Sequence, residues 1–447
     1  MQDRPLMISS LIDYAATFHG DTELVSRLPE GPIRRTTWRE VNERSKQVAN
    51  ALAELGIEQG DRIATLAWNS DRHLALYFGV SGSGAVMHTV NPRLFREQIV
   101  YIINHAEDRI LFFDITFAAL VAELAPELTT VTTYVAMTDR EHMPEVPGIP
   151  EGALLCWDEF VGRQSTHYDW PEFDELSASS LCYTSGTTGN PKGVLYSHRS
   201  TMLHTLMAAA RDANDVHSGS VILLVVPMFH ANAWGTPYTA AMVGAKLVLP
   251  GPHLDGESVY QLMKAEGVNQ SQGVPTVWMM LFSYLDEHPE IDPHELGLRI
   301  AGTGGAALPL SMIERFERDF GAQAMQGWGM TETSPLCVIG RLLPKHEKLS
   351  EAEKHQIMLK QGRGICGVEL KIVDDDGVEP GILQGAHDVR PDVSRASGDQ
   401  PAHVAPHVEG SAYPADPRVF TITWRAWAGT RSRSVSTTSF WTASRTG

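Results

Sequence analysis

The sequence has few cysteines, and their spacing does not suggest a metal site. The 447 residues include four, at Cys156, Cys182, Cys337 and Cys366. They form no CxxC pair and have no histidine at a metal-ligand interval, so we expect neither disulfides nor bound zinc. This usage is typical of a reducing compartment, and we expect a cytoplasmic protein.

Positive charge and long hydrophobic runs are also scarce. Lys and Arg number 36 against 54 Asp and Glu, which gives a formal net charge of -18. This balance argues against a nucleic-acid partner. The longest apolar run, Val221 to Phe229, is too short to span a bilayer, and the N-terminus lacks the apolar region of a signal peptide. We therefore expect at most peripheral membrane contact.

Lysine and leucine disappear toward the end of the chain. The last lysine is Lys371 and the last leucine is Leu383. The remainder is rich in Arg, Ala, Ser, Thr, Pro and His without periodicity, which fits a disordered tail or an out-of-frame translation of GC-rich DNA. Three tryptophans in this region favour the second explanation. We expect residues 384–447 to lie outside the native fold.

The rest of the chain has the pattern of an α/β protein. An apolar content of 43% is enough for a sizeable core. Residues 1 to about 60 show helical spacing, and from Arg62 short apolar runs alternate with amphipathic stretches. This alternation predicts a parallel, doubly wound sheet. Strands are expected near 63–67, 85–90, 110–113, 180–183, 221–226, 246–249, 270–273 and 298–303. Helices are expected near 71–82, 95–106, 198–211, 232–243, 259–266, 277–285 and 310–320.

Composition also suggests where the chain divides. Residues 136–177 are rich in Pro, Glu and Asp and read as a connector. We therefore expect two α/β subdomains, 1–177 and 178–364, each with a helix-flanked sheet. The stretch Gly367 to Gly377 alternates apolar and charged residues and ends in Asp-Gly, a hairpin signal. Residues 365–383 should begin a small β-barrel subdomain.

The stretch from Tyr183 to Gly193 has the composition of a phosphate-binding loop. It reads Tyr-Thr-Ser-Gly-Thr-Thr-Gly-Asn-Pro-Lys-Gly. Glycines let backbone approach an anion, hydroxyls donate hydrogen bonds and a lysine adds charge. The candidate residues are Thr184, Ser185, Gly186, Thr187, Thr188, Gly189 and Lys192. The P-loop of kinases is excluded because Lys192 follows Pro191 and not a glycine. A solvated turn would leave four hydroxyls and a lysine unexplained.

Two further segments follow predicted strands and suggest a ligand pocket. The first, residues 227–235, offers His230, Asn232, Trp234 and Gly235, which could form an apolar wall with a hydrogen-bonding rim. A strand-end histidine alone is more often a satisfied polar cap. The second, residues 302–307, is a glycine-rich turn against which a flat ring or an acyl chain could lie, although such clusters also serve plain turns.

A third segment, residues 327–334, places hydroxyls around a carboxylate. It reads Gly-Trp-Gly-Met-Thr-Glu-Thr-Ser. The carboxylate of Glu332 is suited to Mg²⁺, which binds carboxylate and phosphate oxygens together. Thr331 could donate to an α-phosphate, and Trp328 could pack beside an acyl chain or a base. The alternative is that Thr-Glu-Thr only caps the next helix.

These segments, in this order, resemble the adenylate-forming superfamily of acyl-CoA synthetases, luciferases and peptide-synthetase adenylation domains. The phosphate-loop sequence and Gly-Trp-Gly-Met-Thr-Glu-Thr-Ser are similar to its two signatures. From Ile8 to about Asp376, the chain is similar to bacterial medium-chain fatty acyl-CoA synthetases. The similarity includes Trp68-Asn69 and the stretches from His88 to Phe95 and from Leu181 to Ser200.

The resemblance implies an AMP-forming acid–thiol ligase. A fatty acid would react with ATP to give acyl-AMP, and coenzyme A would then displace AMP. ATP is expected at the phosphate loop and at Gly304, Gly305, Ala306, Gly327, Trp328, Gly329, Met330 and Thr331. The carboxylate substrate is expected at His230, Asn232, Trp234, Gly235, Gly304 and Trp328. Catalytic roles are expected for Lys192, His230, Thr331 and Glu332, the last of which would bind Mg²⁺.

The resemblance stops near residue 380. The family's Thr-Gly-Asp motif, the hinge and the lysine of its C-terminal α+β domain have no counterpart here, so we expect that domain to be absent and activity to be impaired. A non-catalytic protein that binds ATP or acyl-AMP, and a ligase for another carboxylate such as an aryl acid, are alternatives. The expected partners are a small carboxylate, ATP and CoA, with a homodimer left open.

Overall fold

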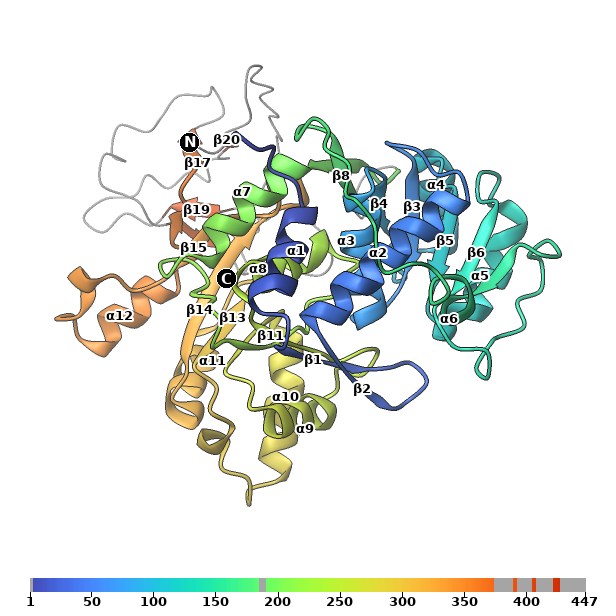
Figure 1. The fold of residues 1–447 in the computed structure, drawn as a ribbon. Helices are drawn as coiled ribbons and strands as arrows, with labels where there is room; N and C mark the ends of the chain where they lie inside the picture. The colour runs from blue at the N-terminus through green and yellow to red at the C-terminus, as the bar shows by residue number, and fades with distance from the viewer. Residues whose placement is uncertain (1–2, 185–189, 374–388, 392–403, 407–420, 427–447) are drawn as a thin grey trace.

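The structure, a computed structural model, describes residues 3–184, 190–373, 389–391, 404–406 and 421–426. Two β-sheets with helices on their faces account for most of the described chain (Figure 1). The expected α/β class with two helix-flanked sheets is confirmed.

The first sheet has seven strands in the order β7-β6-β5-β3-β4-β8-β9. All neighbours are parallel except β8 and β9, which are antiparallel. Strands β4 and β5 are buried along their whole length, as parallel strands covered on both faces are. The strands are β3 (Arg62–Leu66), β4 (Val86–Thr89), β5 (Ile110–Phe113), β6 (Thr133–Ala136), β7 (Leu154–Cys156), β8 (Ala178–Tyr183) and β9 (Gly193–Ser197).

The second sheet has nine strands in the order β16-β15-β14-β13-β12-β10-β11-β1-β2. The β1–β2, β14–β15 and β15–β16 pairs are antiparallel, and the others are parallel. The strands are β1 (Glu23–Arg27), β2 (Ile33–Thr37), β10 (Val221–Leu223), β11 (Lys246–Leu249), β12 (Gln270–Gly273), β13 (Ile300–Thr303), β14 (Gln323–Gly329), β15 (Leu336–Gly340) and β16 (Arg363–Gly364).

One hydrophobic core joins the two sheets. It contains residues of β3 and β4 from the first sheet, β10 and β11 from the second, and helices α1, α2, α3 and α8 between them (Figure 1). Helices α9, α10 and α11 cover the other face of the second sheet, and α4 and α5 that of the first. The helices are α1 (Ser9–Phe18), α2 (Trp38–Glu54), α3 (Asp71–Gly82), α4 (Arg96–Ala106), α5 (Ala118–Leu124), α6 (Trp157–Phe160), α7 (His198–Ala209), α8 (Thr236–Val243), α9 (Gly256–Glu266), α10 (Pro275–Glu287), α11 (Leu310–Arg315) and α12 (Glu351–Met358).

A buried asparagine connects the sheets through the backbone. Asn69 follows β3, and its amide donates to the carbonyl oxygens of Leu224 at 2.6 Å and Val226 at 2.8 Å. Its side-chain oxygen accepts from the backbone N–H of Met228 at 2.7 Å. These bonds satisfy backbone groups of residues 224–228, which follow β10 and are not paired regularly with a neighbouring strand. They fix the position of the segment that leads to His230.

Several sequence-based expectations were wrong. Residues 1 to about 60 are not all helical, because β1 and β2 form a hairpin whose first strand pairs with β11. The expected connector 136–177 contains β7 and α6. The helix expected at 232–243 begins only at Thr236, since the residues before it have left-handed backbone.

The expected subdomain boundary does not separate the two sheets. Strands β8 and β9 lie after residue 177 yet complete the first sheet, while β1 and β2 belong to the second. The reason is that β4 and β8, far apart in sequence, pair directly. Neither sheet is therefore built from one continuous stretch of chain.

The described C-terminal region contains β17, which lies in the stretch predicted to begin a β subdomain, and the short strands β18, β19 and β20, which the sequence did not predict. Strand β17 (Val368–Val373) pairs with β20 (Thr421–Ala426), and β18 (Val389–Pro391) pairs with β19 (Val404–Pro406). The β20 segment is rich in threonine, isoleucine and tryptophan, which favour an extended ladder. The expected Asp-Gly turn lies outside the described residues. No described helix has the length and apolar character needed to cross a membrane.

Candidate active site

The two strands that flank the predicted phosphate loop form an antiparallel hairpin. Tyr183 at the end of β8 pairs with Gly193 at the start of β9, and the N–H of Thr184 donates to the carbonyl of Lys192 at 3.0 Å. The side chain of Lys192 is exposed. Of the predicted phosphate residues, Ser185, Gly186, Thr187, Thr188 and Gly189 lie outside the described residues. The stem thus fixes both ends of the loop.

The hairpin stem is anchored to α4. The hydroxyl of Tyr183 lies 2.7 Å from Nδ1 of His105, and burial raises the pKa of this tyrosine to about 12. The neighbouring ring of His88 is fully buried, with its Nδ1 2.6 Å from the carboxylate of Asp108. Burial raises the pKa of that carboxyl group. Polar side chains of α4 and β4 therefore contact the end of β8.

Three predicted site segments meet at Gly304. This glycine follows β13, and its parallel neighbour β14 carries Gly327. A Cβ atom placed on Gly304 would lie 2.9 Å from the ring of Trp234 and 3.1 Å from the carbonyl oxygen of Gly327. The glycine-rich turn, the segment after His230 and the Gly-Trp-Gly segment are therefore in contact. Only glycine fits between them without displacement of a neighbour.

The segment that carries Trp234 is a left-handed turn. Ala231, Asn232, Ala233 and Trp234 have φ values of 43°, 52°, 49° and 55°, a conformation that costs L-residues roughly 1–2 kcal/mol each. Asn232 is 2% exposed. Its amide donates to Oγ of Ser180 at 2.8 Å, and the thiol of Cys182 donates to its oxygen at 3.4 Å. Strand β8 thus holds the turn through Asn232.

The Thr-Glu-Thr segment lies against the same hairpin. Residues Thr331–Thr333 form a short 3₁₀ turn after β14, and the hydroxyl of Tyr196 on β9 donates to the carbonyl of Thr331 at 2.6 Å. Glu332 is partly buried. Trp328 is buried against Cys337 and Val338, so it faces β15.

Two residues that sequence reasoning missed connect these parts. One is Tyr196. The other is His204 on α7, which is 3% exposed. Its ring lies 2.6 Å from a Cβ placed on Gly235, and its Nε2 accepts from the N–H of Leu336 at 3.4 Å. Burial lowers the pKa of His204 to about 4, so it is neutral near pH 7. Tyr196 lies within the stretch from Leu181 to Ser200 that carries the resemblance, but nothing in that stretch indicated its contact with Thr331. His204 lies outside the segments that the sequence singled out.

The site offers polar groups that lack partners within the protein. Among the described residues, Oγ1 of Thr303 and Nε1 of Trp328 are buried without a hydrogen-bond partner. Thr303 and Trp328 adjoin Gly304 and Gly327 in sequence, and the ring of Trp328 packs against β15.

Glu332 is a single carboxylate beside the hairpin, and its chemistry can be compared with what a magnesium ion requires. Within the described part of the chain, three potential ligands come together at Glu317, Glu351 and His355, away from Glu332. One carboxylate is what Mg²⁺ needs when substrate phosphates provide further ligands. The donor set at Glu332 therefore fits magnesium bound together with ATP.

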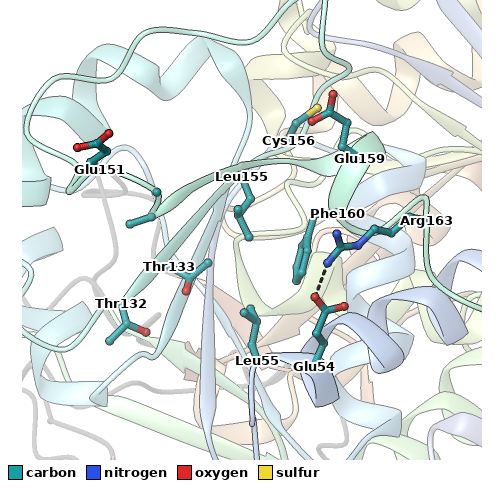
Figure 2. A pocket seen from close by; sticks show the side chains of 12 residues that line it. Glu54, Leu55, Thr132, Thr133, Glu151, Leu155, Cys156, Glu159, Phe160 and Arg163 are labelled. Carbon is teal, nitrogen blue, oxygen red and sulfur yellow. Dashed lines mark hydrogen bonds and ion pairs between the residues drawn. The ribbon is translucent and has the colours of Figure 1, made fainter.

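A groove elsewhere on the protein contains none of the predicted site residues. It has a volume of about 530 Å³ and lies beside β6 and β7, at the edge of the first sheet opposite β9. Figure 2 shows Arg163 directed toward Glu54 within it, where the two form an ion pair. Of the predicted residues, Asn232 and Thr331 are bonded to the β8–β9 hairpin instead.

Comparison with known proteins identifies the class. Residues 12–384 match the AMP-binding enzyme family, and the chain belongs to it. It is an enzyme of the acid–thiol ligase type.

Individual relatives share much of the sequence. The chain is 48% identical over 390 residues to a 3-methylmercaptopropionyl-CoA ligase of Ruegeria lacuscaerulensis, covering 86% of this chain and 71% of the relative. It is 47% identical over 380 residues to a medium-chain-fatty-acid–CoA ligase of Ectopseudomonas oleovorans, covering 85% and 68%. A long-chain-fatty-acid–CoA ligase of Archaeoglobus fulgidus has the same fold, with a TM-score of 0.74 at 19% identity, covering 95% and 76%.

Proposed function

We propose that this protein activates a medium-chain fatty acid. In the first step a carboxylate oxygen attacks the α-phosphorus of ATP, and pyrophosphate leaves as acyl-AMP forms. In the second step the sulfur of coenzyme A attacks the acyl carbonyl, AMP leaves and the thiol proton is released. Both steps depend mainly on positioning and on stabilisation of developing charge.

The observation that carries the proposal is the meeting of separate segments at the hairpin. Gly304 contacts Trp234 and Gly327, and the Thr331 turn is bonded to β9. In this arrangement Lys192 and the loop hydroxyls would hold the β- and γ-phosphates, and Thr331 would donate to the α-phosphate. Glu332 would bind magnesium, which neutralises phosphate charge when present.

The remaining residues would hold the acid and the nucleotide. Gly304, Gly305 and Ala306 would border adenine and the acyl chain, while His230 and Trp234 would surround the reacting carboxylate. The turn provides Ala231, Ala233 and Gly235, which carry no charge. This composition supports an apolar acid over a cationic one, because an unpaired cation there would be costly.

A second candidate substrate is a short thioether acid. The 48% identity to a 3-methylmercaptopropionyl-CoA ligase is as high as that to the medium-chain ligase. An aryl acid is a third candidate, and nucleotide binding without turnover is the non-catalytic alternative. Substrate comparison separates these possibilities.

The decisive experiment is ATP–pyrophosphate exchange with octanoate, 3-methylmercaptopropionate and benzoate. We expect octanoate to give a kcat/KM at least roughly tenfold above benzoate, since each additional buried methylene contributes to binding. Higher activity with 3-methylmercaptopropionate would favour the second candidate. Measurable ATP binding without exchange on any acid would establish the non-catalytic alternative.

Thioester formation requires a separate measurement. Pyrophosphate exchange reports only the formation of acyl-AMP. Release of AMP in the presence of octanoate and coenzyme A measures the second step, and we expect it to depend on coenzyme A. Exchange without any thioester product would limit the proposed function to the first step.

A further inference from the structure

Tyr196 occupies a position between two segments of the proposed ATP site. It lies on β9, the strand that leaves the phosphate loop, and it is 3% exposed. Its hydroxyl donates to the backbone carbonyl of Thr331, 135 residues further along the chain, at 2.6 Å. A side chain on the loop hairpin thus bonds directly to the backbone of the Thr-Glu-Thr turn.

The Thr-Glu-Thr turn has its own internal bonds, which make it a compact unit. The N–H of Met330 donates to Oγ1 of Thr333 at 2.9 Å and to the carbonyl of Pro335 at 3.0 Å. The N–H of Thr333 donates to the carbonyl of Met330 at 2.9 Å. The Tyr196 bond therefore positions a preformed turn relative to the hairpin.

The surroundings keep Tyr196 in its hydrogen-donating form. Burial, together with nearby groups that include the Glu332 carboxylate, raises the pKa of Tyr196 well above its usual value. The hydroxyl consequently stays protonated at neutral pH.

We propose that Tyr196 is a positioning residue that fixes Thr331 and Glu332 relative to strand β9 of the hairpin. This inference rests on the proposed function, in which the loop binds the β- and γ-phosphates while Thr331 and Glu332 serve the α-phosphate and magnesium. The two halves of the triphosphate site come from different sheets. Because misplacement by a fraction of an ångström weakens such contacts, a rigid link between the halves has a direct effect on magnesium–ATP binding.

The test compares Tyr196→Phe with the wild type and with Tyr134→Phe. The first variant removes the hydroxyl and keeps the ring. The second makes the same change at a buried tyrosine on β6, remote from the hairpin. Two quantities are measured on the full chain: ATP affinity by calorimetry with and without Mg²⁺, and amide hydrogen exchange of residues 328–336 without nucleotide.

We expect Y196F to weaken ATP binding roughly tenfold with Mg²⁺ and less than about twofold without it. We also expect exchange in residues 328–336 to be roughly fivefold faster, because the turn loses its bond to the hairpin. Y134F should match the wild type in both. A bond with only a general structural role would not produce the magnesium dependence.

Other outcomes overturn the inference or the function separately. Unchanged exchange in Y196F would show that the hydroxyl does not position the turn. If exchange in Y196F were faster but its affinity for magnesium–ATP equalled that of the wild type, the position of the turn would not affect ATP binding. If the wild type itself binds no ATP, the proposed function fails, and the exchange measurement still decides whether Tyr196 holds the turn.

Discussion

Gly304 illustrates how one residue without a side chain allows three segments to meet. Its Cβ position is 2.9 Å from Trp234 and 3.1 Å from a backbone oxygen, and contacts this short force a neighbour to move. We predict that Gly304→Ala lowers the rate of octanoate-dependent pyrophosphate exchange by roughly tenfold or more, since displacement of catalytic groups is costly. Steady-state exchange kinetics provide the measurement.

The matched control for this substitution is Gly219→Ala. A Cβ on Gly219 would contact only the side chain of His217, which lies in a loop before β10. Exchange activity of G219A should equal that of the wild type. If G304A also retained full activity, contact among the three segments would not be required for the reaction.

Residues with chemical signatures could be located from sequence, whereas supporting residues could not. Thr331 and Glu332 stand in a recognisable motif, and the structure brings their turn to the loop hairpin. Tyr196 and His204 act through contacts with residues more than a hundred positions away. Such contacts depend on which strands and helices pack together, and the local sequence does not indicate this.

At the scale of elements, the left-handed turn Ala231–Trp234 is the least expected feature. Its residues have positive φ although none is glycine. We predict that Ala231→Gly changes the stability little. Glycine removes strain of roughly 1–2 kcal/mol, which offsets the loss of one buried methyl group at about 0.8 kcal/mol and the greater backbone entropy of glycine in the unfolded chain, about 0.5–1 kcal/mol. Urea unfolding monitored by circular dichroism measures the difference.

The control is Ala53→Gly, an exposed position in the regular helix α2. Glycine there should cost about 1 kcal/mol, the usual difference from alanine within a helix. If A231G lost as much stability as A53G, the turn would not be strained.

Helices and strands with strong local patterns were predictable. Helix α3 spans Asp71–Gly82, as the sequence predicted, and begins with the side chain of Ser70 as its cap. The turn before α8 was missed because its conformation depends on Asn232, whose bonds to β8 are non-local. Strands β1 and β2 were missed because helical spacing on either side of them dominated the reading of residues 1–60.

At the scale of the whole molecule, the sequence predicted the class and the existence of two sheets but not how strands are shared between them. The alternation of apolar runs and amphipathic stretches is a local property of the sequence, and it predicted strands and helices in both sheets. The order of strands within a sheet depends on which strands pair along their edges, and this pairing is non-local. The N-terminal hairpin belongs to the second sheet because β1 pairs with β11, more than 200 residues further along the chain.

The shared core also makes stability depend on pH. His73, His198 and His204 are buried, and burial lowers the pKa of each to about 4. Between pH 6.5 and 4 the unfolded chain therefore binds protons that the folded protein does not, so stability falls as pH falls through this window. Asp114 has the opposite effect, because burial raises its pKa to about 7. Below that pH the folded protein binds a proton that the unfolded chain does not, so this group stabilises the folded state as pH falls.

We predict that His198→Gln makes this acid-induced loss of stability shallower. Nδ1 of His198 accepts a hydrogen bond from the N–H of Ile8 at 3.2 Å, and the glutamine oxygen can replace it. Removing one proton-binding group of the unfolded state reduces the slope by roughly 1.4 kcal/mol per pH unit within the window. Unfolding free energies from urea titrations between pH 4.5 and 6 measure the slope. His167→Gln, at a side chain that is 83% exposed, should leave the slope unchanged, and equal slopes for H198Q and the wild type would contradict the assignment to buried histidines.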